Sequence, residues 1–228
     1  ASAQAEVSVE QPAFELQAEA DAADLRQFTA RMQRVDSGAA LRLTGVGDVL
    51  VVSGAPLYPK GLGDELPLVI AMRALRLRSA SADGVDAVVP ASGLTDRFAR
   101  MDRTGGLDLS VPPAEVRMPW AAVTPPRAGW EAAAQLPVQQ LREAAAEGIA
   151  AVAEASPSGA GALAVDKVRR MVWSRPLPGC ETAPLGAAFG LDAAGFAVGE
   201  TAMVYRSGPW LRFATPAGFI ITRSIEAG

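Results

Sequence analysis

Two periodicities of apolar residues follow each other along the chain and predict the type of each segment. At the start, Val7 and Val9, and then Phe14 and Leu16, alternate with polar residues. Alternation with a period of two places successive side chains on opposite sides of an extended chain. We therefore expect residues 1–20 to be extended.

The spacing then changes to three and four residues, which is typical of an amphipathic helix. Asp21 can cap its N-terminus, where a carboxylate interacts favourably with unpaired backbone N–H groups. Gly38 can adopt the left-handed conformation that ends a helix. The apolar stripe of this helix consists of Leu25, Phe28, Met32 and Val35.

Between this helix and residue 111, short alternating segments separated by glycine-containing turns predict a sheet. Gly45-Val46-Gly47-Asp48 is typical of a hairpin turn, and Ser92 can cap a short helix that Gly105-Gly106 ends. We expect an α+β domain over residues 1–115, with a mixed β-sheet and two helices. The expected strands are residues 41–43, 49–52, 69–78, 85–89 and 107–111.

Residues 112–136 differ in composition from the segments around them. Proline pairs at 112–113 and 125–126 accompany Trp120 and Trp130 among several alanines. A proline-rich stretch is typical of a domain boundary, whereas indole rings are usually buried. We therefore expect residues 116–135 to form an ordered linker that packs against a domain.

The last third of the chain predicts helices followed by strands. Pro137 suits the first turn of a helix whose apolar stripe includes Leu141 and Ile149. Three helices followed by a hairpin is the element order of a winged-helix module, so we expect a winged-helix-like domain over residues 136–228. The other expected elements are helices over residues 163–173 and 183–194, a hairpin over 202–213 and a strand over 219–222.

Composition narrows the possible functions. The 228-residue chain contains no histidine and one cysteine, Cys180. This argues against histidine-based acid–base relays, Ser–His and Cys–His nucleophile pairs, and Cys/His metal cages. The adjacent Glu181 also opposes a thiolate at Cys180. We expect no catalytic residue, no cofactor and no metal site.

Two glycine motifs invite a nucleotide-binding interpretation, and both lack its other requirements. Gly45-x-Gly47 is followed by a strand, although a dinucleotide fingerprint needs a helix there. Gly159-Ala160-Gly161 precedes a helix, but the lysine and hydroxyl of a phosphate-binding loop are missing. We interpret the first as a hairpin turn and the second as a loop.

Positive charge is concentrated around the second C-terminal helix, at Lys167, Arg169, Arg170 and Arg175. In a DNA-reading winged helix the third helix should contact the bases. That helix, residues 183–194, contains no lysine or arginine, and the net charge of the chain is −4. Nucleic-acid binding is therefore an alternative rather than the main hypothesis.

The segment from residue 206 to residue 219 is the most distinctive part of the chain. Trp210 and Phe213 lie on opposite faces of a strand, so one layer of helices cannot bury both. We expect the hairpin to form a contact surface for another copy of the chain; the alternative is that the N-terminal region covers it. The candidate surface consists of Tyr205, Arg206, Trp210, Arg212 and Phe213.

Three motifs stand out in the second half of the chain: Trp120…Pro125-Pro126…Gly129-Trp130, Pro184-Leu185…Ala188-Phe189…Gly195-Phe196 and Gly208-Pro209-Trp210-Leu211-Arg212…Thr215-Pro216-Ala217-Gly218. They resemble an uncharacterised family of actinobacterial proteins. The resemblance covers most of the chain, is strongest after residue 118 and implies no known activity, cofactor or site. It agrees with an alanine-rich composition in which Lys60 and Lys167 are the only lysines, as expected from a high-GC genome.

The main hypothesis is a non-catalytic interaction or regulatory protein. Two alternatives stay open: an enzyme that uses carboxylate or Ser/Thr groups at an unrecognised site, and a weak nucleic-acid-binding protein. We expect a protein partner, with a homodimer as one option. A single cysteine and the absence of an apolar run of about 20 residues favour the cytoplasm and argue against a membrane.

Overall fold

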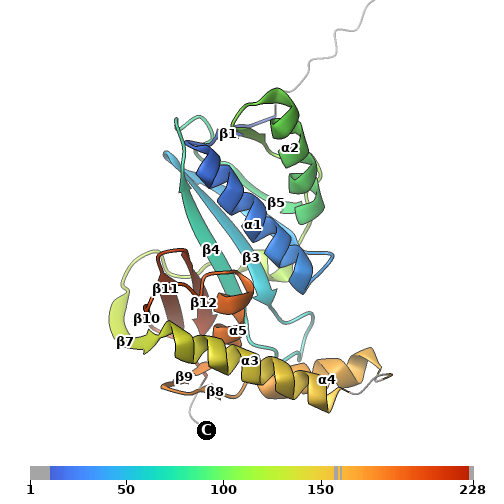
Figure 1. The fold of residues 1–228 in the computed structure, drawn as a ribbon, viewed down its shortest axis with the longest axis vertical. Helices are drawn as coiled ribbons and strands as arrows, with labels where there is room; N and C mark the ends of the chain where they lie inside the picture. The colour runs from blue at the N-terminus through green and yellow to red at the C-terminus, as the bar shows by residue number, and fades with distance from the viewer. Residues whose placement is uncertain (1–10, 157–158, 160, 226–228) are drawn as a thin grey trace, which may run out of the picture.

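An antiparallel sheet of eight strands combines strands from both halves of the chain. The computed structural model describes residues 11–156, 159 and 161–225. Across the sheet the strands follow the order β5-β2-β3-β4-β12-β11-β10-β7 (Figure 1). The first four strands come from the N-terminal half, and the last four come from the C-terminal half.

The N-terminal half supplies its four strands together with two helices. Helix α1 precedes the meander β2-β3-β4, and β5 returns to pair with β2. The short strands β1 and β6 pair with each other in a separate two-stranded sheet. The elements are β1 (Ala13–Glu15), α1 (Glu19–Val35), β2 (Ala40–Val46), β3 (Val49–Leu57), β4 (Val69–Arg76), β5 (Asp86–Pro90), α2 (Ala91–Thr104) and β6 (Asp108–Ser110).

The C-terminal half begins with a 3-10 turn, an edge strand and two helices. A small β8–β9 hairpin and a short helix then lead into the meander β10-β11-β12. The elements are η1 (Pro119–Ala122), β7 (Glu131–Pro137), α3 (Val138–Ala155), α4 (Ala162–Trp173), β8 (Pro176–Leu177), β9 (Cys180–Pro184), α5 (Gly186–Ala193), β10 (Thr201–Ser207), β11 (Trp210–Thr215) and β12 (Gly218–Arg223).

The two halves share a succession of one helix and a three-stranded meander. In the N-terminal half α1 precedes β2-β3-β4, and in the C-terminal half α5 precedes β10-β11-β12. The last strands of the two meanders, β4 and β12, pair antiparallel, with Ile70 opposite Ile221. This pairing of corresponding strands relates the meanders by an approximate two-fold rotation, and α1 and α5 contact each other beside that axis.

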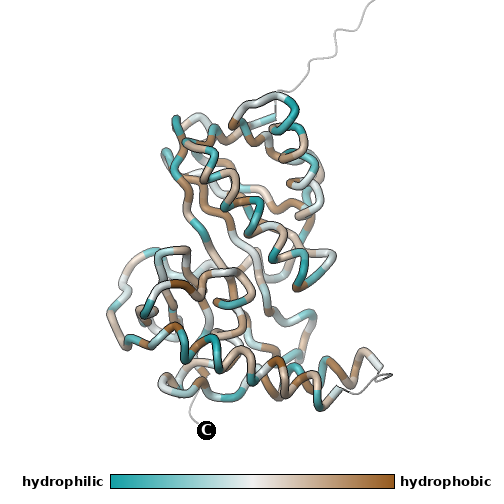
Figure 2. The backbone as a smooth tube through the Cα atoms, in the orientation of Figure 1, coloured by the Kyte–Doolittle hydropathy of each residue, from teal (hydrophilic) through white to brown (hydrophobic). Residues whose placement is uncertain are grey.

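The helices that contact the sheet pack on one of its faces (Figure 1). Side chains on this inner face are fully buried, among them Leu43, Val52 and Phe213. The strands are mainly hydrophobic along their length, whereas α1 alternates between hydrophilic and hydrophobic residues (Figure 2). Helices α1 to α5 leave the opposite, outer face uncovered in the described part of the chain, so its side chains depend on other segments for cover.

Local signals explain how α1 begins and how α2 ends. Helix α1 starts at Glu19, and Asp21 lies inside its first turn, where its carboxylate accepts a hydrogen bond from the Ala18 N–H at 3.0 Å. The prediction that Asp21 is the N-terminal cap is therefore wrong. Its carboxylate still stabilises the same end of the helix. Helix α2 ends at Gly105, whose φ of 65° is the left-handed conformation expected there.

The α+β class is confirmed, and two helices lie in the N-terminal half and three in the C-terminal half. The expectation of a mixed sheet is corrected, because every pairing in the eight-stranded sheet is antiparallel. Short hairpin connections account for the antiparallel pairs β2–β3, β10–β11 and β11–β12. The third C-terminal helix begins at Gly186 rather than Ala183, because Cys180–Pro184 pairs with β8.

The hairpin expected over residues 202–213 is present as β10–β11. It is not a free wing, because β12 and β7 extend it on both sides into the large sheet. The extended segment expected over residues 1–20 is represented by β1, and residues 1–10 lie outside the described part of the chain. No helix among the described residues has the length and apolarity needed to cross a lipid bilayer.

Candidate interaction surface

The two faces of the C-terminal meander separate the residues that the sequence analysis grouped into one surface. Phe213 faces the helices and is fully buried. Arg206 lies on the same inner face, because Val204, its neighbour two positions earlier, is paired with Phe213. Tyr205 and Arg212 are paired on the outer face. Phe213 and Arg206 therefore do not share a surface with Tyr205 and Arg212.

Trp210 lies on the outer face but contributes little accessible area. Only 7% of the residue is exposed. The guanidinium of Arg223, its partner on β12, lies over the indole at 4.8 Å from the ring centroid. The opposite orientation of Trp210 and Phe213 is as predicted, but neither ring is left exposed, because the inner layer covers Phe213 and Arg223 covers part of Trp210.

Arg212 lies at the centre of a cluster that we call the aromatic–arginine face, consisting of Trp130, Tyr205, Arg212 and Phe219. Its guanidinium carbon is 4.8 Å from the ring centroid of Tyr205, 5.3 Å from that of Phe219 and 5.4 Å from that of Trp130. These distances are within the range of cation–π attraction. The buried Nε atom of Arg212 has no hydrogen-bond partner. The rings thus hold a guanidinium that the described residues do not neutralise.

The proline-rich segment after residue 112 brings Trp130 to this face by crossing the outer side of the sheet. The Val116 N–H donates to the Val88 carbonyl of β5 at 2.9 Å. Nη1 of Arg42, on the outer face of β2, donates to the Ala121 carbonyl at 2.9 Å. Trp120 is 3% exposed, so it anchors the segment. The segment is therefore bound to the sheet at the edge strand β5 and, through Arg42, on the outer face.

The position of Trp130 itself depends on a local turn. Its indole Nε1 donates to the Pro126 carbonyl at 3.1 Å. Gly129 has a φ of 76°, a left-handed conformation that favours glycine. The chain then enters β7, which pairs with β10 beside Tyr205. The turn and the edge strand together place the indole ring beside Arg212.

A groove of about 480 Å³ opens where the crossing segment meets the end of β12. Its walls are mainly apolar, and Arg223 contributes a positive charge. Since Arg223 also covers Trp210, the groove adjoins the outer face of the C-terminal meander. The residues that line it include Pro59, Pro67, Pro119, Trp120, Pro184 and Arg223.

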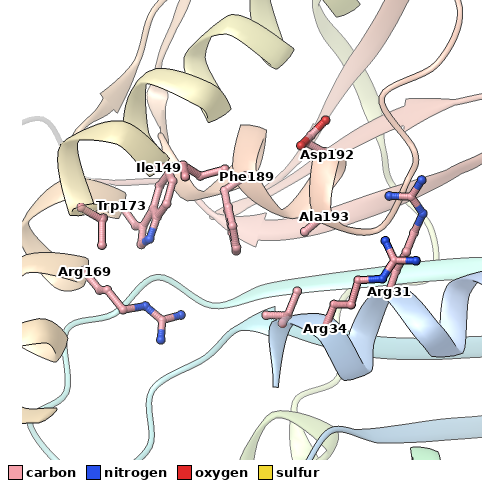
Figure 3. A pocket seen from close by; sticks show the side chains of 10 residues that line it. Arg31, Arg34, Ile149, Arg169, Trp173, Phe189, Asp192 and Ala193 are labelled. Atoms are coloured by element: carbon pink, nitrogen blue, oxygen red, sulfur yellow. The ribbon is translucent and has the colours of Figure 1, made fainter. Parts of the chain in front are cut away.

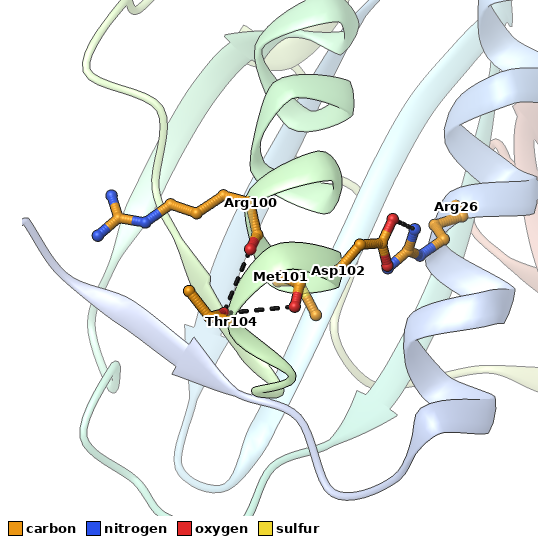
Figure 4. Close-up of polar contacts among 5 residues, drawn as sticks. All are labelled: Arg26, Arg100, Met101, Asp102 and Thr104. Atoms are coloured by element: carbon orange, nitrogen blue, oxygen red, sulfur yellow. Dashed lines mark hydrogen bonds and ion pairs between the residues drawn. The ribbon is translucent and has the colours of Figure 1, made fainter.

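Two carboxylates with shifted pKa values are engaged by arginines. Arg42 donates from Nε and Nη2 to the two oxygens of Asp86 at 2.7 and 2.6 Å, and these hydrogen bonds lower the pKa of Asp86. Arg26 holds Asp102 in the same way at 2.9 and 2.6 Å, which lowers the pKa of Asp102 (Figure 4). Both carboxylates stay ionised at neutral pH, so they join β2 to β5 and α1 to α2 rather than act as acids.

The loop before β4 is joined to α4 through Asp64. Burial acts to raise the pKa of Asp64, but hydrogen bonds from the Lys60 and Leu66 N–H groups and the nearby Arg170 guanidinium outweigh it and lower the pKa. Arg170 lies 3.7 Å from the carboxylate. One of the basic residues on α4 is therefore already paired.

The cysteine and the carboxylates of the described part of the chain do not gather into a group of metal-ligand type. No three of its Cys, Asp and Glu side chains come together in a group that could hold a metal ion. Cys180 is half-buried in β9, with Sγ 3.9 Å from the Thr182 hydroxyl. Gly45 and Gly47 lie at the β2–β3 hairpin, as predicted. In the second glycine motif, Gly161 immediately precedes α4, and residue 160 lies outside the described residues.

The sequence did not reveal that Trp130 belongs with Arg212, because the two are far apart in the chain and meet only across the sheet. The available signal was an indole ring in a segment otherwise made of prolines and alanines. Phe219 was recognisable as a neighbour of the hairpin, but its side of the sheet follows from the register of β12 with β11.

Family comparisons divide the chain at the crossing segment. No curated protein matches the chain. Residues 125–227 match a family described as "Domain of unknown function (DUF8185)". Residues 9–122, half of the chain, match the family described as "Domain of unknown function (DUF8010)". The chain thus belongs to the DUF8010 family and continues into a DUF8185 region, and both are uncharacterised.

Proposed function

We propose that this is a non-catalytic interaction protein that binds an acidic protein segment on its aromatic–arginine face. The observation that carries the proposal is Arg212, whose guanidinium lies over three rings with no ion pair to any described residue. Tyrosine, tryptophan and arginine are the residues that dominate binding energy in protein interfaces. A flat, always charged guanidinium binds a carboxylate through two parallel hydrogen bonds.

The charges on the outer face support a partner other than a second copy docked face to face. The N-terminal part of this face has its arginines paired, as Arg42 is with Asp86 and Arg76 with Asp48. In the C-terminal part, Arg212 and Arg223 are stacked on aromatic rings instead. A symmetric contact would bring these arginines of two copies together, and like charges at an interface are costly. An acidic segment complements them.

The adjoining groove supplies an apolar anchor point for the same partner. Its proline-rich walls and the ring of Trp120 suit an apolar side chain, and Arg223 connects the groove to the outer face. We therefore propose a segment that carries one apolar anchor next to carboxylates. Hot spots of this kind combine a buried apolar contact with a charge pair.

A displayed library of random peptides provides the test. The wild-type protein, immobilised at about physiological salt, should enrich peptides with clustered Asp and Glu. Arg212→Gln should lose those peptides, and Arg212→Lys should recover little, because an ammonium lacks the planar fork. Arg76→Gln is the matched control, since Arg76 is an exposed arginine of the same sheet face and should retain them.

Two outcomes would contradict the proposal. One is enrichment without acidic residues; the other is equal binding of the selected peptides by Arg212→Gln. Sedimentation of the wild type and of Arg212→Gln tests self-association separately, and a dimer that dissociates on this substitution would replace the acidic partner by a second copy.

Three further expectations concern the domain organisation, the location and the origin of the protein. We infer that the two predicted domains, residues 1–115 and 136–228, share one sheet, and that the segment between them is ordered and ends in β7. The change of family between residues 122 and 125 supports this division. We infer a cytoplasmic location because a single cysteine excludes a disulfide within the chain. The arginine-rich, lysine-poor composition supports an actinobacterial origin.

A further inference from the structure

A cleft of about 440 Å³ lies between α1 of the N-terminal half and the three helices of the C-terminal half. It is on the helical side of the sheet, so it is separate from the aromatic–arginine face. One wall is apolar, formed by Ile149 and Val152 of α3 and by Trp173 and Phe189 (Figure 3). A volume of this size is typical of a site for a small molecule.

Positive charge dominates the polar part of the cleft. Arg31 and Arg34 reach it from α1, Arg169 reaches it from α4, and Asp192 is the one carboxylate in its lining (Figure 3). The chain as a whole has a net charge of −4, so this concentration of arginines departs from its average.

These three arginines differ from Arg26 and Arg170, which are paired with carboxylates, in having no such partner among the residues that the structure describes. Arg26 is bound to Asp102, and Arg170 lies beside Asp64. Within the described part of the chain, no side-chain hydrogen bond or ion pair neutralises Arg31, Arg34 or Arg169. Three guanidiniums around one cleft repel each other, and an anion between them relieves that repulsion.

Close packing fixes part of the lining of the cleft. Arg31 lies against Gly195, where an added Cβ would be 2.5 Å from its Nε atom. Trp173 packs on the backbone of Gly148, where an added Cβ would be 2.3 Å from the indole. Trp173 also contacts Phe189, with ring centroids 4.6 Å apart. Arg31 and the Trp173–Phe189 part of the apolar wall are therefore held in place before a ligand binds.

We propose that this cleft binds a small organic phosphate of nucleotide size. The phosphate lies between the arginines of α1 and Arg169 of α4, because guanidinium forks match phosphate oxygens in charge and geometry. The organic part lies on Phe189 and Ile149, which are both more accessible than Trp173. Binding of this kind joins the two halves through their helices. The inference goes beyond the proposed function and does not depend on it.

Calorimetric titration of the whole chain with ATP tests this proposal, with adenosine and inorganic pyrophosphate as comparison probes. ATP should bind with 1:1 stoichiometry at low ionic strength. Arg34→Gln and Arg169→Gln should each weaken ATP binding by about tenfold or more, the usual effect of losing a charge-assisted hydrogen-bond pair. Adenosine should show no binding, and pyrophosphate should bind at least about tenfold more weakly than ATP.

Arg100→Gln is the matched control, because this arginine on α2 points away from the Arg26–Asp102 pair and does not line the cleft (Figure 4). It should bind ATP as the wild type does. Thermal melting of each variant, with and without ATP, separates lost binding from lost folding. The proposal is overturned if ATP does not bind at millimolar concentration, if folded Arg34→Gln and Arg169→Gln bind it normally, or if pyrophosphate binds as tightly as ATP.

Discussion

The ring of Phe28 stacks on the ring of Phe196, with centroids 5.6 Å apart and ring planes 2° from parallel. Phe28 belongs to α1 of the N-terminal half, and Phe196 follows α5 of the C-terminal half. Both rings are 2% exposed. The pair therefore joins the two halves on the helical side, as β4 and β12 join them within the sheet.

This contact predicts a measurable coupling between the halves. Phe28→Ala and Phe196→Ala should each lower the free energy of unfolding by about 3–5 kcal/mol, from lost burial and the cavity left behind. The double variant should be less destabilised than the sum, by about 0.5–1.5 kcal/mol, which is the contribution of the ring pair. Urea denaturation measures all four proteins, and strict additivity would show that the rings do not interact.

Gly195 should be intolerant of a side chain for two separable reasons. Its φ of 78° strains any L residue, and an added Cβ would meet Arg31. Gly63 has the same φ with open space around it, so Gly63→Ala measures the backbone strain alone. We expect Gly195→Ala to cost about 1–3 kcal/mol of unfolding free energy for the strain, plus a further loss that Gly63→Ala lacks. Equal losses in the two variants would leave the Arg31 contact without energetic consequence.

The ion pair between Arg42 and Asp86 predicts a pH-dependent contribution to stability. The pKa of Asp86 is lower in the folded than in the unfolded chain, so its contribution is present above the unfolded pKa of about 3.9 and is lost as pH falls through the folded value. Asp86→Asn should cost about 0.2–1 kcal/mol at pH 7, because the pair is partly exposed. The difference from wild type should shrink below about pH 3.

Urea midpoints at pH 7 and in acid test that dependence. Asp96→Asn is a suitable control, since Asp96 is an exposed carboxylate on α2. A loss for Asp86→Asn that is the same at both pH values would mean that the effect comes from packing rather than from charge.

Trp120 should decide whether the crossing segment stays in place. The indole is almost fully buried, so Trp120→Ala should cost about 3–5 kcal/mol. Arg127, an exposed residue between the two tryptophans, provides a cleavage site for trypsin. Wild type should be cut slowly there, and Trp120→Ala much faster. Trp130→Ala, which removes a half-buried ring, should be cut at a rate between those of the wild type and Trp120→Ala. Rapid cleavage of the wild type would show that the segment is not anchored.

The sequence predicted the elements that local patterns determine. The stripe of Leu25, Phe28 and Met32 predicted α1, because a helix brings residues three and four apart onto one side. It did not predict the pairing of β4 with β12, since Ile70 and Ile221 lie in short apolar strands that could pair with many others. It also grouped Phe213 with Arg212, because the partner layers that distinguish the faces of a strand come from distant parts of the chain.

The arginines of the cleft were hidden for the same reason. Arg31 and Arg34 are ordinary residues of an amphipathic helix, and Arg169 is one of several basic residues near α4. Only tertiary packing shows that Arg170 is paired with Asp64 while Arg169 faces the cleft. A single sequence contains the charged residues. It does not contain the distances between arginines and carboxylates, which decide which arginines are left to bind a ligand.

The antiparallel pairing of β4 with β12 means that each half provides the hydrogen-bonding strand edge that the other half needs. If the chain were cut between residues 122 and 125, each piece would retain four strands of the sheet, and the cut would expose a new row of unpaired backbone groups along β4 or β12. Such pieces would be poorly behaved alone, yet each would offer the edge that the other requires. We therefore expect two separately produced fragments to bind each other and restore a single sheet when they are mixed.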